Sequence, residues 1–322
     1  MDKSIDISIV IVNWNTKELL LKCIESIKKE KSIYQKEIIV VDNDSSDNSP
    51  QVIIDHHPDV HLIRNKANLG FAKANNIGIT VSKGSYLCLI NSDVEVLDDC
   101  LYKLYEFIDS NPQIGIVGPK IFYPDMRDHD SCRNYPTLWN NFCEAIALNK
   151  IFSYSKTFSG EHMEYFHHDK TLKTDSLVGC FLMIRRAALN QIGLFDEQFF
   201  IFAEELDLCH RIKKSGWDVV FFPEAAIIHH HGASTSKDPL RFSIEQIISK
   251  IKYWKKHHGR LVVMTFLLIL IMHHGIRLVS ESILYFFKPS EKVQIIQRLS
   301  KNYLCLKYIL SGKYNGNRAS MA

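Results

Sequence analysis

Short apolar runs alternate with helix-like stretches along the first third of the chain. Strands are predicted where β-branched and other apolar residues run almost without interruption, at residues 7–12, 38–41, 60–63 and 86–90. Helices are predicted where apolar residues recur at helical spacing or where proline opens a turn, at residues 19–27, from Pro50 and at residues 71–81. Strands that alternate with helices form right-handed βαβ units. We therefore expect an α/β fold with a mostly parallel, Rossmann-like sheet and flanking helices.

The pattern weakens between residues 111 and 174, where an aromatic, His-rich stretch at 152–168 is typical of a long loop or lid. Periodicity then returns, and it predicts a strand at 176–184, two helices of which the second follows Glu204, and a strand at 219–222. Residues 240–258 are predicted to form a basic amphipathic helix. Residues 261–287 are largely apolar, and they form either an interfacial or re-entrant helix or an ordinary buried helix pair that closes the domain.

The charge is distributed unevenly between two parts of the chain. Residues 237–322 carry 15 Lys and Arg against 4 Asp and Glu, a net charge of +11, whereas the preceding residues carry 24 against 32, a net charge of −8. With 322 residues, two structural units are expected. We expect a main domain at 1–236 and a basic, apolar helical extension at 237–322.

The remaining composition excludes several classes of protein. Hydrophobic residues make up 46% of the chain and charged residues 23%, which is typical of a folded globular protein. Eight cysteines are scattered without a CxxC pair, so a zinc knuckle or a thioredoxin motif is not expected, and reduced cytosolic thiols fit best. The chain begins directly with a strand-like segment, and we expect no signal peptide.

Polar clusters follow three of the predicted strands, at residues 13–15, 42–44 and 91–93. Ligands of parallel sheets bind beyond the carboxyl ends of the strands. Asp42 could accept a hydrogen bond from the ring N–H of uracil or thymine, and a carboxylate in the third cluster could hold a divalent cation on a diphosphate. Ordinary turns have the same composition, so these clusters alone leave both interpretations open.

Two further clusters carry candidate chemistry. Glu204, Glu205 and Asp207 stand at a predicted helix start, where they either complement the helix dipole or provide a general base. Three consecutive histidines, residues 229–231, either form a surface cluster or supply a metal ligand.

The order of these segments resembles a family 2 glycosyltransferase of the GT-A fold, and within it the bacterial rhamnosyltransferase-like branch that builds cell-surface polysaccharide. The resemblance rests on residues 8–15, 40–47, 68–76, 89–93 and 204–217. It extends over roughly residues 5–236, and the basic, apolar tail is also similar to the extensions of that branch.

The resemblance implies roles by position. Asp42 would read the pyrimidine base, and Asp93 would bind Mg²⁺ or Mn²⁺ together with His229, with Asn91 in place of the first Asp of the family's Asp-x-Asp motif. Glu205 stands where the family has its catalytic base, although Glu204 remains an alternative and the register of the histidines is open by a residue or two. The residues implied to line the nucleotide-sugar pocket are Asn13, Asn15, Asp42, Asn68, Gly70, Lys73, Asn91 and Asp93.

The activity implied is single-displacement, inverting transfer of a sugar from a nucleoside-diphosphate donor of the dTDP or UDP type, with L-rhamnose the first candidate. The acceptor would be a lipid-linked glycan. The basic tail would hold the protein, peripherally or through a re-entrant helix, at the cytoplasmic face of the inner membrane, whose anionic surface would be a further partner. No nucleic-acid partner is expected.

Three other functions were weighed against this one. A Rossmann-type oxidoreductase needs a G-x-G-x-x-G motif after the first strand, and residues 13–18 contain no glycine. A nucleotidyltransferase needs a basic, glycine-rich loop for a triphosphate. A non-catalytic, nucleotide-sugar-binding subunit of a glycan assembly complex remains open, because it would share the same binding residues.

Overall fold

The computed structural model describes residues 5–30, 34–233 and 235–313. They divide into two compact units, which we call the sheet unit (residues 1–135 and 167–237) and the helical unit (residues 136–166 and 238–322). The start of the chain (residues 1–4), Ser234 and the end of the basic tail (residues 314–322), all considered above, lie outside the described residues. Residues 136–166 belong to the helical unit, whereas we had expected them in the main domain.

The strands of the sheet unit are β1 (Ile7–Asn13), β2 (Lys36–Asp42), β3 (His61–Arg64), β4 (Tyr86–Asn91), β5 (Val94–Val96), β6 (Ile114–Phe122), β7 (Cys132–Arg133), β8 (Leu172–Lys173), β9 (Ser176–Leu177), β10 (Phe181–Arg185) and β11 (Asp218–His229). Its helices are α1 (Lys17–Lys29), α2 (Ser49–His56), α3 (Phe71–Val81), α4 (Cys100–Ser110), α7 (Arg186–Ile192) and α8 (Glu204–Lys214), with a 3₁₀ turn at Thr235–Lys237. The helix expected at residues 71–81 and the four early strands are all present, to within two residues at nearly every end.

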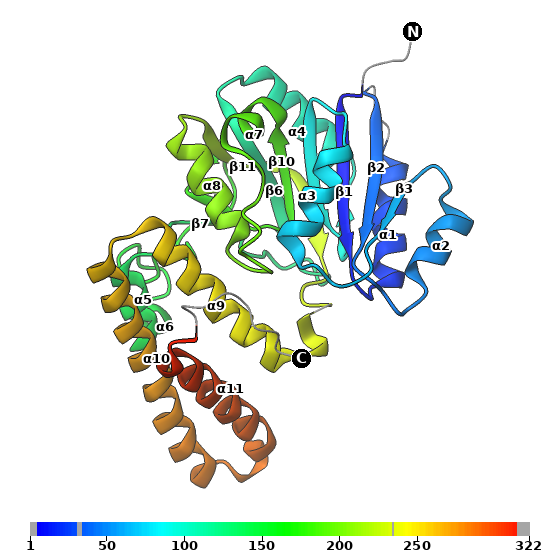
Figure 1. Ribbon diagram of the computed structural model, residues 1–322. Coiled ribbons are helices and arrows are strands. Elements are labelled where there is room, and N and C mark those ends of the chain that lie inside the picture. Colours follow the sequence, from blue (N-terminus) through cyan, green and yellow to red (C-terminus); the bar gives the residue numbers. More distant parts are fainter. Residues whose placement is uncertain (1–4, 31–33, 234, 314–322) are drawn as a thin grey trace. The chain divides into compact units, whose positions relative to one another are not determined.

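The main sheet is mixed rather than mostly parallel. Its strand order is β3-β2-β1-β4-β10-β6-β11-β5, and β8 pairs with β11. Strands β1 to β4 are parallel, as the βαβ pattern predicts, but β10 enters antiparallel between β4 and β6 (Figure 1). This strand brings a segment from late in the sequence next to the carboxyl end of β4.

The two faces of β1 pack against different helices. Ile7, Ile9 and Ile11 share a buried core cluster with apolar residues of α1 and α4. On the other face, the α-carbon of Gly78 in α3 lies so close to Val10 that a Cβ there would be 2.4 Å from its side chain. Because side chains alternate along a strand, helices cover both faces and the polar residues are left for the strand ends.

The helical unit contains α5 (Leu138–Ala145), α6 (Leu148–Ile151), α9 (Pro239–His257), α10 (Arg260–Phe287) and α11 (Lys292–Ser311), with a 3₁₀ turn at Pro289–Glu291. The short turn makes α10 and α11 a helical hairpin, and α10 also packs against α5 and α9 (Figure 1). The expected amphipathic helix and apolar stretch are both helices. The stretch at 152–168, expected to be a long loop or lid, contains no helix or strand. It follows α6 and is divided between the two units.

Candidate functional site

The ends of β1, β2 and β4 are joined by a chain of side-chain hydrogen bonds. Asn13 Nδ2 donates to Asp42 Oδ1 at 2.8 Å, and Asn13 Oδ1 accepts from the Thr16 hydroxyl at 2.8 Å. The Thr16 hydroxyl in turn lies 2.7 Å from that of Ser92. Asn13 and Asp42 are almost completely buried, with 0% and 1% exposure. The candidate base-reading carboxylate is therefore fixed to the loop that carries Asp93.

The other predicted pocket residues of α3 and the first loop have varied surroundings. Asn15 has a φ of 56°, and its Oδ1 accepts from the Ser46 amide at 2.7 Å. Asn68 Oδ1 accepts from the Gly70 amide at 3.0 Å, which shapes the turn into α3. Lys73 is half exposed and its ammonium lies 3.4 Å from a Glu197 carboxylate oxygen. Asn15 thus braces the loop after β2, whereas Lys73 is held on the surface of α3.

Strand pairing brings Asp93 and His229 together. β5 follows Asp93 directly, and its residue Val94 pairs with His229 at the end of β11. His229 Nε2 lies 3.3 Å from Asp93 Oδ1, and both side chains are at most 10% exposed. Burial opposes ionisation of Asp93, but the hydrogen bond and charge of His229, together with backbone hydrogen bonds, outweigh burial and lower the pKa of the carboxyl.

The donor atoms around this pair suit a hard divalent cation. Asn91 Oδ1 and His229 Nδ1 are buried, with no hydrogen-bond partner among the residues described. Carboxylate, amide oxygen and imidazole are accepted ligands, and Mg²⁺ takes few protein ligands when a diphosphate completes its shell. The described part of the chain contains no cluster of three or more His, Cys, Asp and Glu side chains suited to a metal. The site therefore fits a cation that is held jointly by protein and substrate.

The three consecutive histidines have different neighbours. His230 Nε2 lies 2.7 Å from Glu95 Oε1, on the far side of β11 from Asp93. The ring of His231 lies 5.5 Å from that of His229 and 5.5 Å from that of His129. His229 is thus the histidine next to Asp93, and His129 adds an aromatic wall that the sequence analysis did not include.

At the start of α8, Glu204 is buried and Glu205 is partly buried. Oε2 of Glu204 and Oε2 of Glu205 have no hydrogen-bond partner within the described residues. Burial raises the pKa of Glu205, and burial together with the Glu205 carboxylate raises the pKa of Glu204 well above its usual range. A carboxyl with raised proton affinity is suited to taking a proton from a hydroxyl group.

The turn between β9 and β10 connects the two halves of the site. A Cβ on Gly179 would lie 3.1 Å from Cβ and Cγ of Glu205, so this glycine permits close packing of the carboxylate side chain. The next residue, Cys180, accepts from the Asn91 amide through its carbonyl at 2.9 Å. Burial alone would lower the pKa of His229, but its contacts with Cys180 and Asp93 raise that pKa to about 10. Contacts therefore run from Glu205 to Asp93 without a break.

Arg133 is a further site residue that the sequence analysis missed. Its charge acts on both Glu205, whose pKa it lowers, and His231. Its Nε is buried without a hydrogen-bond partner among the residues described. No motif surrounds this arginine, which is placed here by the two-residue pairing of β7 with β9 and by a hydrogen bond from the Thr174 hydroxyl to its carbonyl. A guanidinium group is suited to binding a diphosphate or to stabilising a developing anion.

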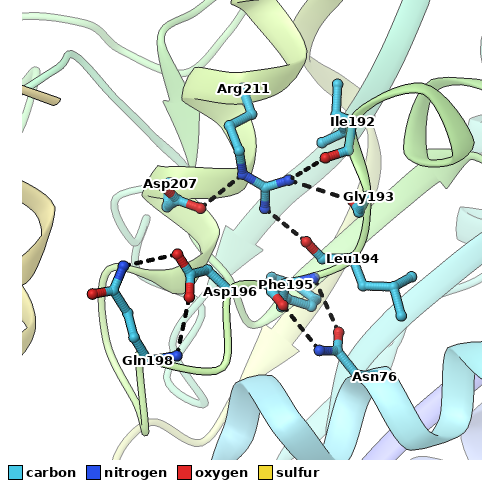
Figure 2. A network of polar contacts seen from close by, with 9 residues as sticks. All are labelled: Asn76, Ile192, Gly193, Leu194, Phe195, Asp196, Gln198, Asp207 and Arg211. Carbon is cyan, nitrogen blue, oxygen red and sulfur yellow. Dashed lines mark hydrogen bonds and ion pairs between the residues drawn. The ribbon is translucent and has the colours of Figure 1, made fainter. Parts of the chain in front are cut away.

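Asp207 differs from the other two acidic residues of α8. Its side chain is 0% exposed and pairs with Arg211 through a 2.8 Å contact between Oδ2 and Nε. Figure 2 shows that Arg211 extends from this pair to the carbonyl groups of residues 192–194, with contacts of 3.0, 3.4 and 2.9 Å. On the other side of the same loop, Asn76 of α3 exchanges two hydrogen bonds with the Phe195 backbone. Asp207 thus holds the loop that leads into α8.

That loop reaches Glu204 through a strained backbone. Phe202 and Ala203 are consecutive residues with φ of 69° and 62°, in a region that side chains disfavour. The same segment contacts the nucleotide side of the site, because the Phe71 amide donates to the Phe200 carbonyl at 2.6 Å. Gly70, with φ of 86°, is required there, since a Cβ would come within 2.5 Å of Phe200. Strain of this kind is concentrated at functional sites.

The mixed α/β sheet, with a buried acid–imidazole pair and a raised-pKa carboxylate beyond its strand ends, has the architecture of the GT-A type. The fold agrees with the solved structure of the mannosyltransferase PcManGT from Pyrobaculum calidifontis in complex with GDP-Man and Mn²⁺. The TM-score is 0.57 at 14% identity, over 95% of this chain and 88% of the other.

Sequence comparison is more specific. The family model "Glycosyl transferase family 2" matches residues 8–193, and this chain belongs to that family. Its relatives include the N-acetylglucosaminyl-diphospho-decaprenol L-rhamnosyltransferase of Mycobacterium tuberculosis, 29% identical over 63% of this chain and 69% of that protein. The dTDP-rhamnosyl transferase RfbF of Shigella flexneri is 26% identical over 71% of this chain and 70% of that protein. The predicted family and fold are confirmed.

Proposed function

We propose that this glycosyltransferase moves L-rhamnose from dTDP-rhamnose onto a lipid-linked glycan acceptor and inverts the anomeric carbon. The observation that supports glycosyl transfer is the continuous series of contacts that links Glu205, through Gly179 and Cys180, to His229 and Asp93. The choice of rhamnose is supported by relatives named as rhamnosyltransferases, and the lipid-linked acceptor by the name of the mycobacterial relative.

The donor would bind across the strand ends. Asp42 would accept the N3–H of thymine or uracil, because its carboxylate is already oriented by Asn13 and by the Ser45 amide, which donates to Oδ2 at 2.9 Å. A base that lacks this N–H could not make that hydrogen bond to the buried carboxylate, which is the basis of discrimination. Asn15, Asn68 and Gly70 would act on the nucleotide through the loops they shape.

Asp93 and His229, with the Oδ1 atom of Asn91 two positions before Asp93 in the sequence, would hold Mg²⁺ or Mn²⁺. When bound, the cation supplies Lewis-acid stabilisation of the charge that builds on the diphosphate. The protein's own residues do the rest: Asp93 stays ionised because its pKa is lowered, and Arg133 supplies a fixed positive charge near Glu205.

Glu205 would act as the base. It takes the proton of an acceptor hydroxyl while the oxygen forms a bond to the anomeric carbon, and the bond from that carbon to the diphosphate breaks on the opposite face. dTDP leaves with the electron pair of the broken bond. One displacement and one base give inversion. Glu204 would raise the proton affinity of the pair, and Asp207 would position the helix through Arg211.

The helical unit would hold the enzyme at the cytoplasmic face of the membrane. α10 is long and apolar enough to cross a bilayer by length and composition, and 22% of its most apolar window is buried. Its exposed apolar side chains form one stripe, which includes Leu261, Met264, Leu268, Val279, Ile283 and Phe286. Arg277 and Glu281 lie within the helix, and such charges are costly at a bilayer centre, so we favour a helix lying in the interface.

The test is turnover by the purified full-length protein with a synthetic lipid-linked acceptor. We expect dTDP release and inverted product with dTDP-rhamnose, loss of turnover with EDTA, and recovery with Mn²⁺. Glu205→Gln should abolish turnover but retain donor binding. Turnover that persists in EDTA would remove the cation from the proposal, and a faster reaction with UDP-hexoses would overturn rhamnose as the sugar.

A further inference from the structure

The helical unit encloses a positively charged cavity that is separate from the residues proposed above for donor binding and chemistry. Its volume is about 310 Å³, and it is lined by residues of α5, α6, α9, α10 and α11. Five cationic side chains line it against two acidic ones, which gives a net charge of +3 with neutral histidines; the seven are Lys150, Lys250, Arg277, Arg298, Lys301, Glu144 and Glu281.

The two acids neutralise only part of this positive charge. Glu281 is engaged by Arg298, whose Nε lies 2.9 Å from Oε2. Burial opposes ionisation of Glu144, but the charges of Lys250, His273, His162 and Arg277 together lower the pKa of its carboxyl. Lys301 and Lys150 add two further charges to the lining. A cavity with such an excess of cationic donors is suited to a multiply charged anion.

A buried imidazole in the lining points independently to a ligand. His274 is 5% exposed, and its Nδ1 lies 2.9 Å from Asn302 Oδ1. The amide of Asn302 is oriented by Nδ2, which donates to the Arg298 carbonyl at 2.9 Å. Nδ1 must therefore carry the proton of the neutral ring, and Nε2 is left as an acceptor.

That acceptor has no hydrogen-bond partner within the described residues. A buried polar atom without a partner is costly and needs an explanation, such as a group that arrives with a ligand. An anion that draws a second proton onto the ring would let Nε2 donate a hydrogen bond to it.

The position of the cavity along α10 indicates which kind of anion it would bind. His274, Arg277 and Glu281 follow one another at intervals of three and four residues, so they share one side of the helix. At 100° per residue, the exposed residues Leu268, Val279 and Ile283 lie about 180° away. One helix thus separates a cationic cavity from the apolar stripe proposed to lie in the membrane.

We propose that this cavity binds the diphosphate of a membrane-anchored prenyl diphosphate, the group that links the acceptor glycan to its lipid. The inference rests on the proposed function for the identity of the lipid. The shared chemistry is a diphosphate, which could also come from inorganic pyrophosphate, and the experiment separates these two sources.

Farnesyl diphosphate is a soluble probe of this site. Its binding to the full-length protein is measured by calorimetry with saturating dTDP present, so that the donor site is filled. Lys301→Gln removes one charge from the lining, and Lys307→Gln, on an exposed position of the same helix outside the cavity, is the matched control. We expect Lys301→Gln to weaken binding about tenfold, the scale of one charge-assisted hydrogen bond, and Lys307→Gln to leave it unchanged.

Three results would overturn the proposal. Equal effects of the two substitutions would mean general charge attraction, and equal affinity for farnesol would mean that the diphosphate is not recognised. Pyrophosphate that binds as tightly as farnesyl diphosphate would assign the cavity to a soluble anion. The binding assay requires no turnover. A protein that binds the probe selectively but does not transfer rhamnose would therefore refute the proposed function alone.

Discussion

Replacing Asp207 with asparagine separates a structural from a chemical role among the three acidic residues of α8. The amide has the shape of the carboxylate but lacks its charge, and one of its orientations presents an NH₂ group to Arg211. Arg211 would keep its contacts with the carbonyls of residues 192–194 but would lose its only acidic contact in Figure 2. A partly buried guanidinium would then lack a counter-charge.

The size of the effect follows from burial. Asp207 is 0% exposed and Arg211 is 18% exposed. Breaking a buried ion pair by removing one partner costs about 3–5 kcal/mol, and the partial solvation of Arg211 places this pair near the lower end, at about 3 kcal/mol. We expect the free energy of unfolding of the sheet unit to fall by that amount.

Urea unfolding followed by circular dichroism measures the loss, and kcat at low temperature measures what remains of the chemistry. Asp207→Asn should retain kcat to within about tenfold once folded, because its carboxylate does not take the proton. Glu205→Gln is the reciprocal control, with stability retained and kcat lowered by at least about a hundredfold, the usual contribution of a general base. If Asp207→Asn were as stable as the parent but inactive, Asp207 would belong to the chemistry and our assignment would be wrong.

Three further outcomes are expected. Because burial raises the pKa of Glu205, kcat/KM should fall at acid pH, with an inflection above the usual glutamate pKa of about 4.3. Glu205→Asp should shift this inflection, and an unchanged inflection would exclude Glu205 as the titrating base. The pKa of Glu204 is also raised in the folded state, so its contribution to stability is lost as pH rises. Glu204→Gln should therefore increase Tm relative to the parent at pH about 8. Thermal melts should show this difference vanish below pH about 4.5. Ala203→Gly should stabilise the protein by about 1 kcal/mol in urea unfolding, because Ala203 has a φ of 62°, and a loss of stability would contradict the strain.

The sequence predicted the parts of the fold in which one physical signal dominates. β1, β2 and β4 are buried on both faces, so their apolar runs are continuous, and α3 repeats apolar positions at helical spacing. β6 was missed because Gly115, Gly118 and Pro119 interrupt its pattern. The two glycines are needed for close packing, since a Cβ on Gly115 would lie 2.8 Å from Trp217 and one on Gly118 would lie 3.1 Å from Leu177. Local propensity is overridden there by tertiary contact.

The candidate site also combines features that the sequence indicates with features that only the strand pairing determines. Polar residues at strand ends were visible because parallel strands place their carboxyl ends on one edge, and the sequence correctly grouped Asn13 with Asp42. The histidine register was open because adjacent positions on a strand differ only in the face they occupy. Pairing of β11 with β5 places His229 beside Asp93 and His230 beside Glu95, which supports His229 as the proposed metal ligand.

The residues that join the site are of a kind that motif reasoning does not detect. Gly179 and Cys180 carry no charge and lie inside what is read as one apolar strand, yet they touch Glu205 and Asn91. They do so only because β10 runs antiparallel between β4 and β6, an arrangement that the parallel βαβ pattern does not contain. A substitution at Gly179 would therefore displace the proposed base without altering any polar residue. The distance between the proposed base and the proposed cation site thus depends on the turn between β9 and β10, which contains neither of them.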